Sequence, residues 1–319
     1  MAFSLGTWNP QPWTGKIPRK LVQTSAVLGL ANAGGNFSVM KSGTETRPVD
    51  AEFTVRAYGK LETIDLQSPE MGEVTLRARK IEGAAVIAEE DLVEGKAYSV
   101  DIVRNLRDRG TSNTAAYFDN ASLGTSGDAT TGETNILRPY RSLYTAVRVD
   151  APAGNYTTIA AAGTVAEYRA AIKGMIETAE RTEYAEDIVV IMSDYWQSYL
   201  RDMPVDGSNG RPIWDQEGGT ILGKPIYWTK GARLASTSGA GTATHNPVGN
   251  HLAFAGPRNH LMVGRAPFST GNAAVPEAYL SDPTTGVGML NDSAWFKLRS
   301  RLAMSVAEAD AWTALERLA

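Results

Sequence analysis

Cysteine is absent from this chain of 319 residues, and charged residues make up only 21% of it. Without cysteine there can be no disulfide framework, no thiolate metal site and no cysteine nucleophile. The uncharged stretch of residues 21–40 carries Gln, Thr, Ser and Asn, so it is too polar for a membrane-spanning helix. Residues 1–4 do not begin a basic start followed by an apolar core, so we expect no signal peptide. Together these absences favour a soluble protein made in the cytoplasm.

Motifs of common catalytic sites are lacking as well. None of the Gly-Lys pairs is followed by the Ser or Thr of a phosphate-binding loop, and no Gly-x-Ser-x-Gly turn is present. His245, His251 and His260 lie in one stretch, but they lack helical spacing and no ordered set of carboxylates accompanies them. We therefore expect structural histidines, with no catalytic residues, no metal site and no cofactor.

Basic residues are concentrated near the N-terminus. Residues 1–44 contain Lys16, Arg19, Lys20 and Lys41 but no Asp or Glu. The rest of the chain holds 27 of the 31 basic residues and all 35 acidic ones. A basic arm on an acidic body can lie on a neighbouring subunit, or lightly on nucleic acid. The alternative is an unstructured terminus that is only incidentally basic.

Two alternating segments follow this arm. Apolar and polar residues alternate over residues 52–58 and again over residues 73–79, which predicts two half-buried strands. The intervening residues 59–72 are too many for a tight hairpin, so we expect a protruding loop. An antiparallel ribbon of two strands cannot bury a core of its own. We expect it to lie over a neighbouring copy.

A long helix is predicted next. Apolar side chains recur at helical spacing from Tyr98 to Leu106, and acidic residues at 89–91 precede them, where a helix N-terminus favours negative charge. Residues 110–113, Gly-Thr-Ser-Asn, predict that the helix ends or kinks there. Residues 124–132, rich in Gly, Ser and Thr, indicate a linker to a second unit.

The second unit is predicted to be a compact α/β layer. Residues 164–182 have the pattern of an amphipathic helix, residues 188–192 that of a buried strand, and residues 193–203 that of a further helix. Residues 295–304 alternate between an apolar and a basic face, which predicts another strand. Residues 306–318 predict a C-terminal helix.

The order of these parts resembles that of the major capsid proteins of tailed bacteriophages. In that family an arm leads into an extended hairpin loop, a spine helix in a peripheral domain, an axial α/β domain and a return to the peripheral domain. The similar segments are residues 73–94 (return strand and acidic helix), 96–124 (spine helix), 210–213 and 221–226 (axial strand pair), and 254–265 with 295–304 (closing strands).

This resemblance covers nearly the whole chain and implies an α+β, Hong Kong 97-type capsid fold. The implied divisions are an N-terminal arm at 1–45, an extended hairpin loop at 46–82, a peripheral domain with the spine helix at 83–130, an axial domain at 131–257, and a peripheral return with the C-terminus at 258–319.

The implied function is structural. We expect a major capsid protein that forms hexamers and pentamers of an icosahedral virion shell and contacts packaged double-stranded DNA non-specifically. It would be made in the bacterial cytoplasm, without a membrane. Because the arm begins at Met1, scaffolding is expected to be a separate protein, beside a portal and a decoration protein. The residues expected to contact other subunits are Trp8, Trp13, Lys16, Arg19, Lys20, Arg56, Lys60, Glu62, Asp65, Glu70, Arg77 and Arg79.

One feature of the family's type member is not expected here. That protein joins subunits by an isopeptide bond between a loop lysine and an asparagine, assisted by a glutamate. Lys60 matches the lysine, but the alignment places Asp292 and Arg299 at the other two positions, so we expect interlocking arms and loops alone. Two alternatives remain: an encapsulin-type nanocompartment shell of the same fold, and a soluble α+β hydrolase that uses His251 or His260.

Overall fold

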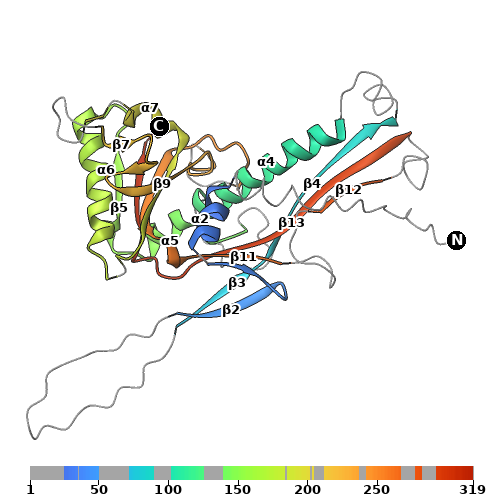
Figure 1. Cartoon of the computed structure of the whole chain (residues 1–319), viewed down its shortest axis with the longest axis horizontal. Helices are drawn as coiled ribbons and strands as arrows, with labels where there is room; N and C mark the ends of the chain where they lie inside the picture. The colour runs from blue at the N-terminus through green and yellow to red at the C-terminus, as the bar shows by residue number, and fades with distance from the viewer. Residues whose placement is uncertain are drawn as a thin grey trace, which may run out of the picture.

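The computed structural model describes residues 25–34, 36–49, 72–89, 102–125, 139–183, 185–201, 203–204, 212–236, 242–266, 277–281 and 292–318. A seven-stranded sheet with helices on both faces forms one end of the molecule, and a long peripheral sheet with a helix along it extends to the other end (Figure 1).

The seven-stranded sheet is mixed, with the order β5-β14-β10-β6-β9-β8-β7. Its β14–β5 and β6–β9 pairs are parallel, and the other pairs are antiparallel. The central strands β6 and β10 are buried along their whole length, which explains their nearly continuous apolar sequences. The strands are β5 (Tyr156–Ile159), β6 (Ile188–Ser193), β7 (Trp214–Asp215), β8 (Thr220–Ile221), β9 (Lys224–Thr229), β10 (His251–Pro257) and β14 (Thr313–Arg317).

Helices cover both faces of this sheet. Helix α6 (Val165–Glu180) packs on one face through an apolar stripe that includes Ile172 and Ile176. It begins at Thr164, whose side chain forms a capping box with Glu167. The short helices on this side are η2 (Asp194–Trp196) and α7 (Gln197–Leu200), and α2 (Ala26–Gly34) and α5 (Leu143–Val149) lie on the other face; η1 (Ala153–Asn155) and η3 (Arg258–His260) are single turns.

The peripheral sheet is built around one long strand, β13 (Ser293–Val306). On one side β13 pairs with β4 (Arg79–Ala88), and on the other with β12 (Glu277–Leu280) and β11 (Leu261–Arg265), all antiparallel. Strand β1 (Phe37–Val39) adds in parallel to β11. Helix α4 (Ile102–Leu123) lies along one face of this sheet, and the opposite face is uncovered among the described residues (Figure 1).

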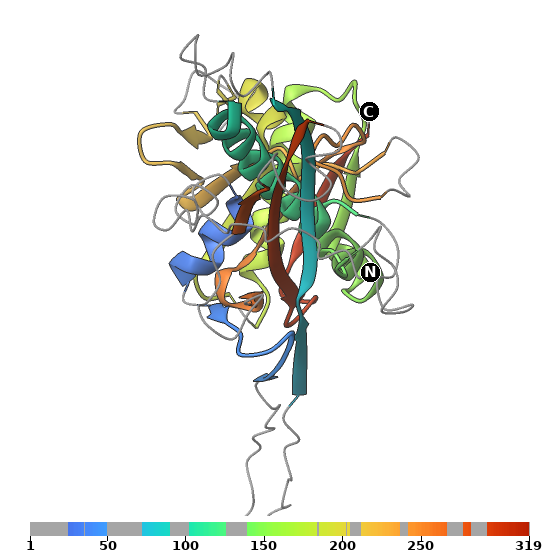
Figure 2. The ribbon, with the colours of Figure 1, turned by 90° about the vertical axis from the view of Figure 1, so that its right-hand side faces the viewer.

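A separate two-stranded sheet continues the peripheral sheet beyond its lower end in Figure 1. Strand β3 (Gly72–Arg77) leads almost directly into β4 and pairs antiparallel with β2 (Thr44–Val49). Seen end-on, β3 extends below β4 and β13 (Figure 2). The predicted strand at 73–79 is therefore confirmed, but its observed partner is residues 44–49. The partner segment that the sequence favoured, residues 52–58, lies outside the described residues, and so does the expected loop at 59–72 apart from Gly72, which is the first residue of β3.

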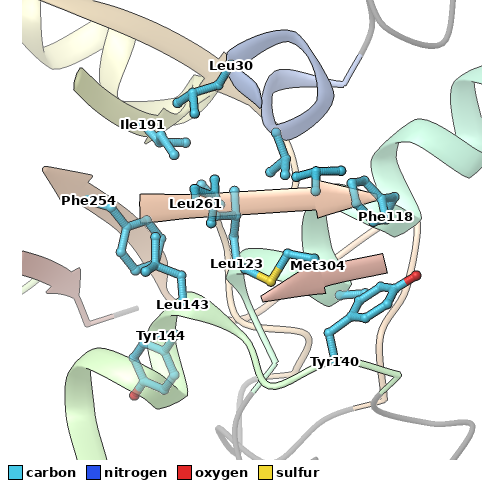
Figure 3. Packing of buried hydrophobic residues seen from close by; sticks show 14 of the residues in the cluster. Leu30, Phe118, Leu123, Tyr140, Leu143, Tyr144, Ile191, Phe254, Leu261 and Met304 are labelled. Atoms are coloured by element: carbon cyan, nitrogen blue, oxygen red, sulfur yellow. The ribbon is translucent and has the colours of Figure 1, made fainter. Parts of the chain in front are cut away.

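One hydrophobic core joins the two sheets. Phe118 and Leu123 at the end of α4, Leu30 of α2 and Met304 of β13 meet Phe254 of the seven-stranded sheet in a single cluster (Figure 3). Tyr140 closes its edge with an edge-on contact to Phe118, at 5.6 Å between ring centroids, and its hydroxyl donates to the Leu302 carbonyl at 2.8 Å. The spine helix is therefore anchored at one end in the core, and its other end lies over the peripheral sheet.

Three predictions about secondary structure are corrected. Part of the expected extended arm is helix α2, with Val27, Leu28 and Leu30 fully buried. Helix α4 continues through residues 110–113, where Thr111 and Thr114 donate to carbonyls one turn earlier and Gly110 lies against Leu298.

The third correction concerns the C-terminus. Residues 313–317 form strand β14, not a helix, and insert between β5 and β10. Every residue of β14 is buried, so the strand shows no two-residue alternation, and the spacing of Ala311, Leu315 and Leu318 imitated a helix. The final strand therefore belongs to the seven-stranded sheet.

Candidate contact surfaces between subunits

Of the twelve residues predicted to contact other subunits, only Arg77 and Arg79 lie in the described part of the chain. Arg77 is exposed at the end of β3, opposite Thr44, and Arg79 is half-buried at the start of β4, opposite Leu302. Both therefore lie where the β2–β3 ribbon joins the peripheral sheet. The other ten lie outside the described residues: Trp8, Trp13, Lys16, Arg19, Lys20, Arg56, Lys60, Glu62, Asp65 and Glu70.

The uncovered face of the peripheral sheet carries a row of ion pairs. Glu82 of β4 accepts from Lys80 at 3.0 Å and from Lys297 of β13 at 3.2 Å. Burial alone would raise the pKa of Glu82, but the hydrogen bonds and the positive charges of the two lysines together outweigh it and hold the pKa below its ordinary value. The Arg299 guanidinium contacts Glu277 of β12 at 2.6 Å. This part of the face is satisfied within one subunit.

An apolar pair lies at the far end of the same face. Val86 of β4 and Trp295 of β13 are directly opposite each other in the strand register. Val86 is 64% exposed and Trp295 is 39% exposed. Tryptophan is enriched where protein surfaces bind each other, and paired apolar side chains on an exposed sheet face have the character of a contact surface. We call Val86 and Trp295 the apolar tip.

The apolar tip was not among the predicted contacts, although the sequence held a signal for it. The alternation over residues 295–304 put Trp295 on the same face as Lys297, Arg299 and Arg301. A tryptophan on an otherwise polar face was therefore visible. Val86 could not have been found in this way, because its place opposite Trp295 depends on a strand pairing between distant segments.

The two residues aligned with the crosslinking asparagine and glutamate have defined surroundings. Arg299 is held by Glu277, and its guanidinium lies over the Tyr279 ring at 4.5 Å from the centroid. Asp292 is exposed at the start of β13, with φ 44°, and its carbonyl accepts from the Glu89 amide at 2.8 Å. Lys60 lies outside the described residues.

The histidines do not form a catalytic arrangement in the described part of the chain. His251 stacks on Tyr195 with ring centroids 4.0 Å apart, and its Nδ1 is 3.1 Å from the Ser193 hydroxyl. Both His251 and Ser193 are buried. Burial, together with the charges of Arg233 and Arg317, lowers the pKa of His251 to about 4. A serine–histidine pair that is closed to substrate and faces cations gives the hydrolase alternative no support.

Metal sites and membrane-spanning helices are both lacking among the described residues. This part of the chain contains no group of three or more histidine or acidic side chains placed to hold a metal ion. No described helix has both the length and the apolar character needed to cross a membrane.

Known structures share this architecture. A structure of Mycobacterium phage Ogopogo matches with a TM-score of 0.64 at 11% identity, over 93% of this chain and 91% of that chain. A structure of Microbacterium phage Oxtober96 matches with a TM-score of 0.61 at 17% identity, over 92% and 91%. The procapsid of satellite phage P4, which includes a size determination protein, matches with a TM-score of 0.54 at 12% identity, over 95% and 99%. The fold is therefore the Hong Kong 97-type fold of capsid proteins.

The sequence leads to the same class. No curated protein matches the chain. The model of the phage capsid family matches residues 6–251, which is most of the chain, and the chain therefore belongs to the phage capsid family. It is a structural major capsid protein and a virion component, and the encapsulin alternative is not favoured.

Proposed function

We propose that this protein forms hexamers and pentamers, and that these close into an icosahedral shell around packaged double-stranded DNA. One observation carries the proposal: the sheet around β13 extends away from the central core, with α4 on one face and, among the described residues, nothing on the other (Figure 1). Such an extension gains little for an isolated subunit. It contributes much more to stability where neighbouring copies cover it, because a symmetric shell is closed by repeating the same contacts between subunits.

The contacts proposed for this assembly come from three regions. The arm supplies Trp8, Trp13 and its basic side chains, the loop supplies Lys60 and its acidic neighbours, and the described surface supplies Arg77, Arg79 and the apolar tip. Long arms and loops add buried area without requiring a single rigid interface. That property suits a subunit that must occupy both five-fold and six-fold positions.

The proposed partners follow from the same role. We expect a separate scaffolding protein, a portal and a decoration protein, and synthesis in the bacterial cytoplasm. Contact with DNA is expected to be non-specific and weak, because the chain has a net charge of −4 and its basic excess is confined to the arm. A strongly salt-dependent affinity of the inner shell surface for duplex DNA would contradict this.

We further propose that the shell is held without isopeptide bonds and that the subunit has no enzymatic activity. Forming an isopeptide bond requires a carboxamide as acceptor and a carboxylate to assist the lysine. Asp292 offers a carboxylate where the acceptor carboxamide would be, and Arg299, already held by Glu277, offers a guanidinium where the assisting carboxylate would be. Boiled shells on a denaturing gel should give one band at the subunit mass of 34.2 kDa. A ladder of higher bands would contradict the proposal.

The assembly itself is tested by electron microscopy of the purified full-length chain. We expect closed shells, or ring-shaped hexamers and pentamers that close when scaffolding protein is added. A preparation that stays monomeric under both conditions would overturn the proposed function.

A further inference from the structure

Helix α4, the spine helix, carries a buried carboxylate that is not one of the proposed contacts between subunits. Asp119 of α4 is fully buried. Its Oδ1 accepts from the Ser25 hydroxyl at 2.5 Å and from the Val27 amide at 3.3 Å. Its Oδ2 accepts from the Thr229 hydroxyl at 2.5 Å and from the Ala26 amide at 2.9 Å. Each oxygen thus takes one hydroxyl and one backbone N–H.

These four donors come from two other parts of the chain. Ser25 and the amides of residues 26 and 27 form the first turn of α2, and Thr229 ends strand β9. Ser25 is itself the N-cap residue of α2, since its hydroxyl accepts from the Leu28 amide at 3.2 Å. The Asp119 carboxylate completes this cap from a different helix by accepting from the amides of residues 26 and 27, and the positive end of the α2 dipole favours its negative charge. Asp119 joins α2, α4 and the seven-stranded sheet at one point.

The surroundings of Asp119 are neutral. From α2 it faces Ser25 and two amides, from β9 it faces Thr229, and its neighbour on α4 is the amide Asn120. Burial raises the pKa of Asp119 to about 6, and the four hydrogen bonds act in the opposite direction. No cation in the described part of the chain contributes to this pKa, so the four hydrogen-bond donors alone stabilise the charge of the carboxylate.

The junction around Asp119 has no spare room. A side chain at Gly231 would place its Cβ 2.4 Å from the Asp119 Cβ. Asn120 donates to the carbonyls of Gly231, at 3.2 Å, and Arg233, at 2.7 Å, and accepts from the Thr244 amide at 3.0 Å. The end of α4 is therefore held on several sides, and α2 is attached to a fixed point.

We propose that Asp119 is a positioning residue that fixes the root of the N-terminal arm on the body of the subunit. Residues 1–24 are the part of the arm that precedes α2, and they join the body at Ser25. Whatever holds Ser25 and the first turn of α2 therefore sets where this part of the arm leaves the subunit. An arm that bridges copies needs that origin to be the same in every copy. This consequence for assembly rests on the proposed function, whereas the anchoring of α2 does not.

Asparagine should not replace this carboxylate. An asparagine side chain would put an NH₂ group, which only donates, in place of one of the two carboxylate oxygens. Each of these oxygens accepts from a backbone N–H, and a backbone N–H can only donate. In either orientation of the side chain, an NH₂ group would therefore oppose a peptide N–H. Asp119→Asn keeps the shape of the residue and removes the anchor.

Hydrogen exchange of the full-length, unassembled chain tests the anchor. In D119N we expect the amides of residues 26–31 to exchange at least about ten-fold faster, the size expected from losing a strong helix cap. The amides of β6 and β10 should not change. T229V, which removes one hydroxyl donor and keeps the carboxylate, should give a smaller effect at the same amides and serves if D119N does not fold. D150N is the matched control, because Asp150 is an exposed carboxylate paired with Arg141 at 2.6 Å.

Unchanged exchange in α2 would overturn the anchor, and so would faster exchange spread equally over β6 and β10, which would make Asp119 a general core residue. Electron microscopy of the same variants then tests positioning. We expect D119N to give irregular shells or shells of mixed diameter where the wild type gives uniform ones. Uniform shells from a D119N chain with a loosened α2 would overturn the positioning role. A wild type that forms no shells would overturn the proposed function and leave the exchange result standing.

Discussion

The buried ionisable side chains of this subunit are stabilised in different ways. Asp119 has only hydrogen-bond donors around it, whereas His251 is neutral between a tyrosine ring and two arginines. Glu316 accepts from the Tyr144 hydroxyl at 2.9 Å and from the Asn250 amide at 2.5 Å, and also from the Tyr156 hydroxyl. Each arrangement supplies hydrogen-bond or ring partners for a polar group inside the core.

The pKa shifts of Asp119 and His251 predict opposite effects of acid on stability. The folded pKa of Asp119, about 6, is above its ordinary 3.8, so its contribution to the unfolding free energy rises as the pH falls from 7 towards 4. The folded pKa of His251, about 4, is below its ordinary 6.5, so its contribution is lost as the pH falls from about 6.5 through 4. In the wild type the two partly offset each other.

Replacing His251 should therefore reveal the effect of Asp119 on the pH dependence of stability. His251→Asn keeps an acceptor for Ser193, and we expect this variant to lose less stability than the wild type between pH 6.5 and 4. Midpoints of urea unfolding at pH 7, 6, 5 and 4 measure this. Parallel profiles for the wild type and H251N would contradict this account, because they would show that folding does not lower the pKa of His251.

At the scale of elements, the last strand of the chain completes the main sheet. β14 lies between β5 and β10, so the C-terminal residues supply an interior strand. Glu316 and Arg317 point to opposite faces, and tyrosines hold both: the Arg317 Nε donates to the Tyr168 hydroxyl at 3.0 Å, and its guanidinium lies 4.8 Å from the Tyr195 ring centroid. We therefore expect folding of the seven-stranded sheet to require β14.

A matched pair of substitutions tests this role. Leu315 is fully buried, and Leu318 is 43% exposed one residue beyond the strand. Leu315→Asp would bury an unpaired charge, and we expect it to destabilise the chain by more than about 3 kcal/mol or to prevent folding. Leu318→Asp should cost less than about 1 kcal/mol. Thermal unfolding measures the loss of stability in both variants. An equal loss in the two would contradict the placement of β14 inside the sheet.

Sequence reasoning predicted the elements whose pattern is set locally. The helix expected at residues 164–182 is α6, because its cap and apolar stripe are both encoded nearby, and the strands expected at 188–192 and 295–304 are β6 and β13. Where prediction failed, distant packing decided. Leu298 covers Gly110 within α4, and helices α5 and α6 bury the two faces of β14.

The candidate contact surface could be predicted only in part, for the same reason. Periodicity showed which residues of β13 share a face, and so indicated that Trp295 is exposed. It could not show that Val86 lies beside Trp295, or that Asp119 reaches the start of α2. Those relations depend on pairings across most of the chain, and they appear only when the fold is known.

At the scale of the whole molecule, the subunit combines a self-contained core with an extension that offers surface to other copies. The ion pairs on the sheet face opposite α4 are satisfied internally, and exposed pairs of this kind contribute at most about 1 kcal/mol each. The apolar tip is different, because covering Val86 and Trp295 would remove apolar area from water. We therefore expect the tip to be covered by a neighbouring copy in the assembled shell.

The most direct measurement is the yield of shells from a tip variant, counted by electron microscopy after sedimentation. Val86→Glu combined with Trp295→Glu places two charges on the apolar tip without touching the core. We expect a folded chain, shown by an unchanged circular dichroism spectrum, whose shell yield falls at least about ten-fold. Val165→Glu is the control, since Val165 is 56% exposed at the first position of α6, where an acidic residue is tolerated. A double variant that forms shells at the wild-type yield would contradict the claim that other copies cover this extension.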